Sequence, residues 1–259
     1  MTGTQNSSFF SHDGLRFAYT DQGEGPATLL IHGFASNGKV NWFDTGWVDL
    51  LLQQGRRVIT FDHRGHGQSN KPHNVSAYEP PVMAYDALAL LDHLNIQRAD
   101  VMGYSMGARV TAFMLLLAPE RLCSAVIAGI GAGLTEGTGD PAPIVEALEA
   151  PSLDDVTTQK GRMFRAFAEQ TKSDLKALAA CMRSSRKKIL PEDLAKIRKP
   201  VLIAVGTRDA IAGSAQGLAD LIPGAQVLDI VDRDHMRAVG DKQYKEGVVK
   251  FWNALPPCV

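Results

Sequence analysis

The 259-residue sequence has little cysteine, little net charge and no long hydrophobic run, and each absence excludes a class of protein. Its 27 basic and 28 acidic residues leave a formal net charge of −1, too little to attract nucleic acid or an anionic membrane surface. No apolar run approaches the roughly 20 residues that cross a bilayer. The polar residues 1–10 carry no basic segment followed by an apolar one. We therefore expect no nucleic-acid partner, no membrane partner, no export signal and a cytoplasmic location.

Cysteine occurs at three widely spaced positions, Cys123, Cys181 and Cys258. An odd number at such spacing fits reduced thiols better than a disulfide framework or a zinc cluster. None of the three lies in a reactive-looking motif. We expect all three to be free thiols.

What the chain does contain is an alternation of short apolar runs with longer amphipathic segments. Its 45% hydrophobic and 21% charged residues are typical of a folded globular protein. Six buried strands are predicted at residues 28–32, 57–62, 101–103, 125–130, 201–206 and 226–231. Apolar residues at helical spacing predict helices at residues 81–94, 106–117, 214–221 and 242–254.

Strand and helix in alternation build a parallel sheet that is covered on both faces. Before the first such unit, residues 9–12 and 15–20 flank the turn-prone Asp13-Gly14 pair, which predicts an antiparallel hairpin at one sheet edge. The expected fold class is therefore α/β, with a mostly parallel, doubly wound sheet of about eight strands.

Residues 131–198 depart from this alternation, because they contain no convincing strand. Gly- and Pro-rich residues lead into predicted helix starts at Ser152, Ser173 and Pro191. We expect a helical cap here, inserted into a core formed by residues 1–130 and 199–259. Such insertions follow the carboxyl ends of strands, where these sheets bind ligands. The alternative is a structural decoration that does not contact substrate.

The segment Gly103-Tyr104-Ser105-Met106-Gly107 lies between a predicted strand and a predicted helix. A Gly-x-Ser-x-Gly sequence in that setting forms a sharp turn with the serine at its apex. Glycine lacks a side chain where strand, turn and helix crowd together, so the serine can adopt a strained backbone and project its hydroxyl. Ser105 is therefore a candidate nucleophile.

Several further segments accompany this turn in order along the chain: His32-Gly33-Phe34, then DHRGHGQS at residues 62–69, GTRD at residues 206–209, and His235. With them the sequence resembles the α/β-hydrolase superfamily, in its serine carboxylesterase and enol-lactonase-like branch with a small helical cap. The resemblance covers nearly the whole chain and is weakest in the insertion. It implies the α/β-hydrolase fold.

A serine hydroxyl needs a base to accept its proton during attack. His235 follows the last predicted strand, and the order Ser105, Asp209, His235 is the order of nucleophile, acid and histidine in the family it resembles. Asp232 and Asp234 are rivals for the acid, but their closeness in sequence makes it difficult for them to fold back onto the ring of His235. The alternatives are a turn-forming role for Asp209 and a surface position for His235.

The resemblance also implies an oxyanion hole made by the backbone amides of Phe34 and Met106. Apolar side chains in the insertion and after the first motif are candidates for an acyl pocket, namely Trp42, Met163, Phe164 and Phe167, with Trp47 beside them. Helix packing explains these residues equally well.

Two other groups receive structural interpretations. His63 and His66 could suggest a metal pair, but no third or fourth ligand stands at metal-site spacing, and both match a structural loop of the family. Arg186, Lys187 and Lys188 form a short basic run that we expect to be solvated surface. We expect no metal and no cofactor.

Three classes of function remain. The first is a serine hydrolase acting on a small carboxylic ester or lactone, because the predicted nucleophile is serine rather than the aspartate or cysteine of other branches. The second uses the same three residues for carbon–carbon hydrolysis, acyl transfer or cofactor-free perhydrolysis. The third is a non-catalytic binding protein on the same scaffold. The sequence leaves the oligomeric state open.

Overall fold

The computed structural model describes residues 7–258, so residues 1–6, which belong to the segment used above to argue against an export signal, lie outside the described part. Eight strands form one sheet in the order β1-β2-β4-β3-β5-β6-β7-β8. The strands are β1 Ser8–His12, β2 Leu15–Gln22, β3 Ala27–Ile31, β4 Arg57–Phe61, β5 Ala99–Tyr104, β6 Leu122–Ala128, β7 Val201–Gly206 and β8 Gln226–Ile230. The predicted α/β fold class with an eight-stranded sheet is confirmed.

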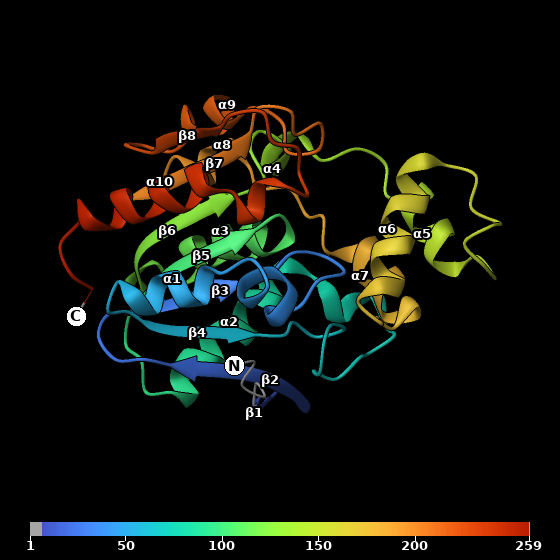
Figure 1. The fold of residues 1–259 in the computed structure, drawn as a ribbon, viewed down its shortest axis with the longest axis horizontal. Helices are drawn as coiled ribbons and strands as arrows, with labels where there is room; N and C mark the ends of the chain where they lie inside the picture. The colour runs from blue at the N-terminus through green and yellow to red at the C-terminus, as the bar shows by residue number, and fades with distance from the viewer. Residues whose placement is uncertain (1–6, 259) are drawn as a thin grey trace.

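Strand direction follows the sequence pattern. β1 and β2 pair as an antiparallel hairpin, and β2 pairs antiparallel to β4. From β4 to β8 every neighbouring pair is parallel. The carboxyl ends of these parallel strands consequently meet at one edge of the sheet, where Figure 1 shows the loops leading toward the protruding helices.

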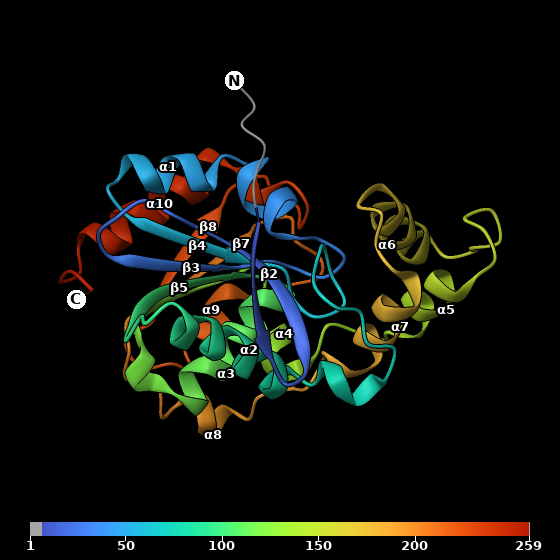
Figure 2. The ribbon, with the colours of Figure 1, turned by 90° about the horizontal axis from the view of Figure 1, so that it is seen from below.

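Helices cover both faces of the sheet, and alternate strand residues pack into two separate cores. Helices α1 Trp47–Gln53 and α10 Lys242–Asn253 lie on one face, and α2 Pro80–His93, α3 Met106–Leu117 and α9 Ala215–Ala219 lie on the other (Figure 2). In β3, Leu29 and Ile31 pack into the core beneath α2 and α3, whereas Leu30 packs into the core beneath α1 and α10. This period of two is what a strand buried on both faces requires.

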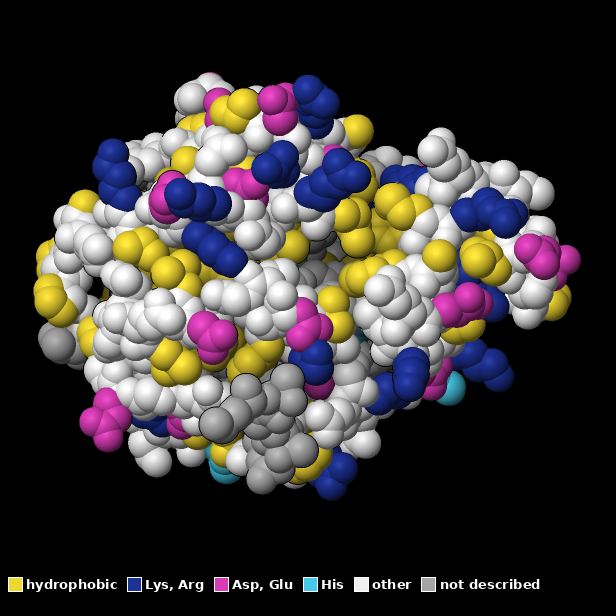
Figure 3. All heavy atoms as spheres, in the orientation of Figure 1, with side chains coloured by type: hydrophobic (Ala, Val, Ile, Leu, Met, Phe, Trp, Pro, Cys, Tyr) yellow, Lys and Arg dark blue, Asp and Glu magenta, His cyan; other side chains and the backbone are white. Residues whose placement is uncertain are grey.

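Five helices lie between β6 and β7: α4 Gly133–Glu136, α5 Ala142–Glu149, α6 Gln159–Gln170, α7 Leu175–Ser184 and α8 Pro191–Leu194. Helices α5, α6 and α7 form a lobe beside the body, whereas α4 and α8 lie against the body (Figures 1 and 2). Hydrophobic side chains gather in the hollow where this lobe meets the body (Figure 3). The division of the chain at residues 131 and 198 stays a prediction.

The helix starts within this segment are only partly as predicted. Pro191 begins α8 as expected, and α7 begins two residues after Ser173 because Asp174 caps it by accepting from the amide of Ala177. The start at Ser152 is wrong. α5 ends at Glu149, and the next helix, α6, begins after Thr158, whose side chain accepts from the amide of Gly161.

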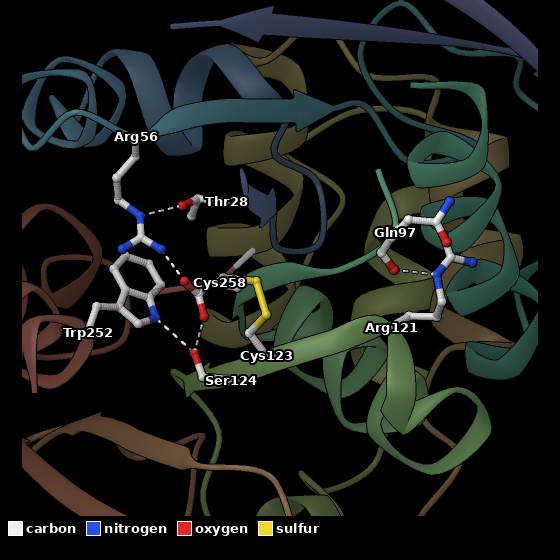
Figure 4. The surroundings of a disulfide bond; sticks show 9 residues. Thr28, Arg56, Gln97, Arg121, Cys123, Ser124, Trp252 and Cys258 are labelled. Carbon is white, nitrogen blue, oxygen red and sulfur yellow. Dashed lines mark hydrogen bonds and ion pairs between the residues drawn. A yellow bond between two sulfur atoms is a disulfide. The ribbon is translucent and has the colours of Figure 1, made fainter. Parts of the chain in front are cut away.

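The expectation of three free thiols is also wrong. Cys123 at the start of β6 and Cys258 near the chain end form a disulfide, with their Cα atoms 5.7 Å apart (Figure 4). Cys181 is free and buried. Beside the disulfide, Trp252 donates to the hydroxyl of Ser124. The sequence separation of 135 residues hides this pairing, because only the fold returns the chain end to β6. Within residues 7–258, none of the helices combines the length and apolar character needed to cross a bilayer.

Candidate active site

Ser105 occupies the sharp turn between β5 and α3. Its φ of 55° and ψ of −111° lie outside the regions that ordinary residues favour. The two glycines of the motif make the turn possible, since a Cβ on Gly103 would lie 2.2 Å from the carbonyl oxygen of Gly107, and one on Gly107 would lie 2.0 Å from that of Ile31. The strained turn projects the Ser105 side chain beyond the strand end.

His235 and Asp209 complete a chain of hydrogen bonds with Ser105. The His235 Nε2 atom lies 3.0 Å from the Ser105 Oγ atom, and its Nδ1 atom lies 2.7 Å from Asp209 Oδ2. A carboxylate only accepts, so Nδ1 donates to Asp209 and the lone pair of Nε2 faces the serine hydroxyl. The other Asp209 oxygen accepts from the amides of Ile211 and Ala212, which fixes the carboxylate. The structure thus brings the three predicted residues together.

The rival acids have other partners. Asp232 forms an ion pair with Arg208 at 2.7 Å, and both side chains are exposed. Its φ of 59° gives it the left-handed position in the loop before His235. Asp234 accepts from the amides of Met236 and Arg237. Neither carboxylate contacts the His235 ring.

The amides of Phe34 and Met106 belong to segments next to Ser105. Met106 is the first residue of α3, whose first amides have no partner within the helix. Phe34 follows Gly33, and a Cβ added to Gly33 would lie only 3.5 Å from the Cβ of Ser105. Among residues 7–258, no hydrogen-bond acceptor satisfies either amide. Both donors are therefore available to a ligand.

Three buried histidines hold the loop that carries Phe34. The His32 Nε2 atom accepts from the amide of His63 at 3.0 Å, so its Nδ1 atom carries the proton and donates to the Gly33 carbonyl at 2.7 Å. His66 packs edge-on against Phe34. Burial lowers the pKa of His32 to about 4 and that of His66 to about 3, and burial with neighbouring positive charge lowers the pKa of His63 well below its usual value. All three rings are thus neutral at pH 7.

Both ring nitrogens of His63 and the Nε2 atom of His66 are buried without a hydrogen-bond partner. In the part of the chain that the structure describes, no three His, Cys, Asp or Glu side chains are grouped so that they could hold a metal ion.

An apolar cavity of about 240 Å³ opens beside Ser105 and His235. Phe164 and Phe167 of α6 line it, as predicted for the acyl pocket. Trp42 does not line it, because its ring is fully buried against Trp47 in the core beneath α1 and α10. Met163 also lies outside this cavity, with 39% of its surface exposed. Sequence reasoning missed three apolar lining residues: Val40, Met236 and Val239.

A second, smaller cavity of about 60 Å³ also reaches Ser105 and His235. Arg109 and Arg186 line it, together with Thr138. The expectation that the whole basic run is solvated surface is therefore wrong for Arg186, which is half-buried, although Lys187 and Lys188 are exposed. Because Arg186 begins a run of three cations, the sequence alone does not distinguish it from its exposed neighbours.

Comparisons with known proteins bear on the family and the fold of this chain. The family model for the alpha/beta hydrolase fold matches residues 26–191. Over 92% of this chain and 94% of the relative, the sequence is 26% identical to 3-oxoadipate enol-lactonase 2 of Acinetobacter baylyi. It is 32% identical to a putative non-heme chloroperoxidase of Synechocystis over 59% of this chain. The shorter matches to curated relatives, this one included, cover between 19% and 54% of the relatives' own length.

Among solved structures, a hydrolase from Pseudomonas aeruginosa PA01 is similar with a TM-score of 0.80 and 25% identity. That similarity covers 96% of this chain and 99% of the other. With the family model matching well over half of its length, this chain belongs to the α/β-hydrolase fold family.

Proposed function

We propose that this protein is a serine hydrolase that cleaves a small carboxylic ester through an acyl-enzyme intermediate on Ser105. The observation that carries the proposal is the hydrogen-bond chain from Ser105 through His235 to Asp209. A serine hydroxyl next to an imidazole that a carboxylate orients is the arrangement that activates serine for nucleophilic attack.

The reaction has two stages. As the Ser105 Oγ atom attacks the ester carbonyl, its proton passes to His235 Nε2, and the buried carboxylate of Asp209 stabilises the resulting imidazolium. The free amides of Phe34 and Met106 would stabilise the oxyanion. When the tetrahedral intermediate collapses, the alcohol leaves with the proton of His235. A water molecule, deprotonated by the same ring, then releases the acid and restores Ser105.

A lactone is a cyclic ester and follows the same two stages. The match to an enol-lactonase over nearly the full length of both chains supports including lactones in the proposal. The cavity of about 240 Å³ is suited to a small acyl or alcohol group. Carbon–carbon hydrolysis, acyl transfer and perhydrolysis use the same residues, and the diketone in the assay below separates the first of these from ester cleavage.

The test is a series of p-nitrophenyl esters with acyl chains of increasing length, run beside a lactone and a diketone. We expect turnover of short esters by the wild-type protein and a loss of several orders of magnitude in Ser105→Ala, because members of such a triad act as a unit. Ser76→Ala, in an exposed turn away from the site, is the control. Turnover of the diketone alone would favour carbon–carbon hydrolysis. Turnover of none of these compounds by the folded wild-type protein would overturn the proposal.

A further inference from the structure

Ser105 stands where two cavities meet, and only the smaller one has arginine side chains in its lining. The apolar cavity and the smaller one share four lining residues: Phe34, Ser105, Phe164 and His235. The rings of Phe34 and Phe164 contact each other edge-to-face with centroids 5.9 Å apart. A substrate held at Ser105 can therefore extend one group into each cavity.

The smaller cavity is lined by two arginines that have no carboxylate partner. The guanidinium of Arg109 donates to the backbone carbonyls of Gly133, Leu134 and Lys187. The guanidinium of Arg186 donates to the Thr138 hydroxyl, the Gly139 carbonyl and the Met182 sulfur. Within residues 7–258, neither guanidinium forms an ion pair with an Asp or Glu side chain.

The positive charge at this end of the site is consequently not neutralised. Arg109 is 3% exposed, and its pKa is lowered to about 10, first by burial and then by the charge of Arg186. Burial also lowers the pKa of Arg186, which the exposed carboxylate of Asp140 partly offsets. Lys160, whose ammonium group donates to the Thr138 carbonyl, adds a third cation nearby. Buried charge is costly unless it is paired.

We propose that the smaller cavity binds a carboxylate of the substrate, so that the natural substrate is an ester or lactone with a free carboxylate a few bonds from the scissile carbonyl. The proposal rests on the hydrolase function proposed above and specifies its substrate class. Arg186 is the residue that would pair with the carboxylate, because it is only half-buried and one of its three partners is a weakly accepting thioether. The apolar cavity would hold the other end of the substrate.

The volume limits the group that can enter. A cavity of about 60 Å³ has room for a carboxylate and one or two methylenes but not for a long chain or a phosphorylated sugar. A planar guanidinium also matches a carboxylate with two parallel hydrogen bonds. Short half-esters of dicarboxylic acids are therefore the compounds to test.

Two pairs of substrates test the proposal. The first pair is monoethyl glutarate and its half-amide, which has the same shape without the charge. The second pair moves the carboxylate to the alcohol side, as 3-carboxypropyl acetate and its amide. In at least one pair we expect the carboxylated compound to have a kcat/KM about 10- to 100-fold above that of the amide, the range of a charge-assisted hydrogen bond.

The variant Arg186→Met keeps the length of the side chain and removes its charge. We expect it to lower the ratio of kcat/KM between carboxylate and amide by about 10- to 100-fold, and Arg186→Lys to restore part of that ratio. Arg198→Met is the control, because it removes the same charge from an arginine that donates to the backbone carbonyls of Ala195 and Ile197 and lines a different cavity. An equal fall for both members of each pair in Arg186→Met would show a purely structural role and overturn the proposal.

A binding measurement separates failure of this proposal from failure of the hydrolase function. Titration calorimetry with Ser105→Ala should show tighter binding of the carboxylated compound than of its amide, and Arg186→Met added to that background should remove the difference. If the wild-type protein hydrolyses no ester, the hydrolase function fails while the calorimetry still decides the carboxylate site. Equal binding of acid and amide in both pairs overturns the carboxylate site alone.

Discussion

The hydroxyl of Tyr104 donates a 2.6 Å hydrogen bond to the backbone carbonyl of His235, so the residue before the candidate nucleophile holds the candidate base. The two rings also contact each other, with centroids 5.6 Å apart. Tyr104 is buried, and burial raises the pKa of its hydroxyl well above the usual value, so the hydroxyl is protonated and donates at neutral pH.

Removing this hydroxyl should loosen His235. We expect Tyr104→Phe to lower the free energy of unfolding by about 1 kcal/mol and kcat by about fivefold, with KM little changed. Tyr19→Phe is the control, because the Tyr19 hydroxyl bonds to His93 far from the site. Steady-state kinetics on a turned-over ester and urea unfolding measure both effects, and unchanged kcat in Tyr104→Phe would contradict a positioning role.

Asp209 is the carboxylate that contacts His235, so its amide variant should be the damaging one. We expect Asp209→Asn to lower kcat about 10⁴-fold, since an amide favours the wrong imidazole tautomer and cannot stabilise the imidazolium. Asp232→Asn and Asp234→Asn serve as controls and should stay within about threefold, as expected for surface changes. A larger loss in either control than in Asp209→Asn would assign the acid to the loop before His235.

The disulfide between Cys123 and Cys258 closes a loop of 135 residues at the amino end of β6, whereas Ser105 follows the carboxyl end of the parallel strand β5. Reducing it should lower the free energy of unfolding by about 3–5 kcal/mol and leave kcat unchanged, because cross-linking restricts the unfolded chain. Thermal unfolding with and without dithiothreitol measures the loss. A Cys123→Ser, Cys258→Ser double variant should already be destabilised and insensitive to the reductant; equal stability of the reduced and oxidised protein would argue against the bond.

The buried histidines predict how stability depends on pH. In the unfolded chain each ring binds a proton near pH 6.5, whereas His32 in the folded protein stays neutral down to about pH 4. The unfolded state therefore binds more protons in this window, and stability falls as the pH falls from 6.5 to 4. His32 alone should account for a loss of about 2 kcal/mol between pH 6.5 and 5.

Urea unfolding at pH 7 and pH 5 measures this loss, and His63→Leu tests its origin. The His63 ring makes no hydrogen bond through either nitrogen, so leucine removes a titrating group without orphaning a partner. We expect the variant to fold and to lose less stability on acidification than the wild-type protein. The same loss in both would mean that His63 does not contribute.

The sheet and the turn at Ser105 could be predicted because local signals suffice for them, whereas Asp209 and His235 are predicted from their order along the chain in the family that the sequence resembles. A short apolar run indicates a strand that is buried on both faces, and the two glycines that flank Ser105 indicate the sharp turn. The prediction that Trp42 lines the acyl pocket is wrong. Trp42 lies in the short helix Lys39–Phe43, and the sequence does not indicate which side of that helix packs into a core. The predicted helix start at Ser152 is wrong because the helix near it, α5, begins earlier. It follows Pro141 directly, within Gly- and Pro-rich residues that are typical of a loop. The inward position of Arg186 and the disulfide depend on contacts between distant segments.

Phe164 and Arg186 belong to the segment between β6 and β7, whereas Ser105, Asp209 and His235 stand on loops at the ends of the strands. Part of the wall of each cavity is thus encoded apart from the three residues of the site, although Val40, Arg109 and Met236 belong to the rest of the chain. Grafting a different helical segment between β6 and β7 could retarget the enzyme while the machinery beneath it stays as it is, which makes that segment the natural place for directed evolution to begin.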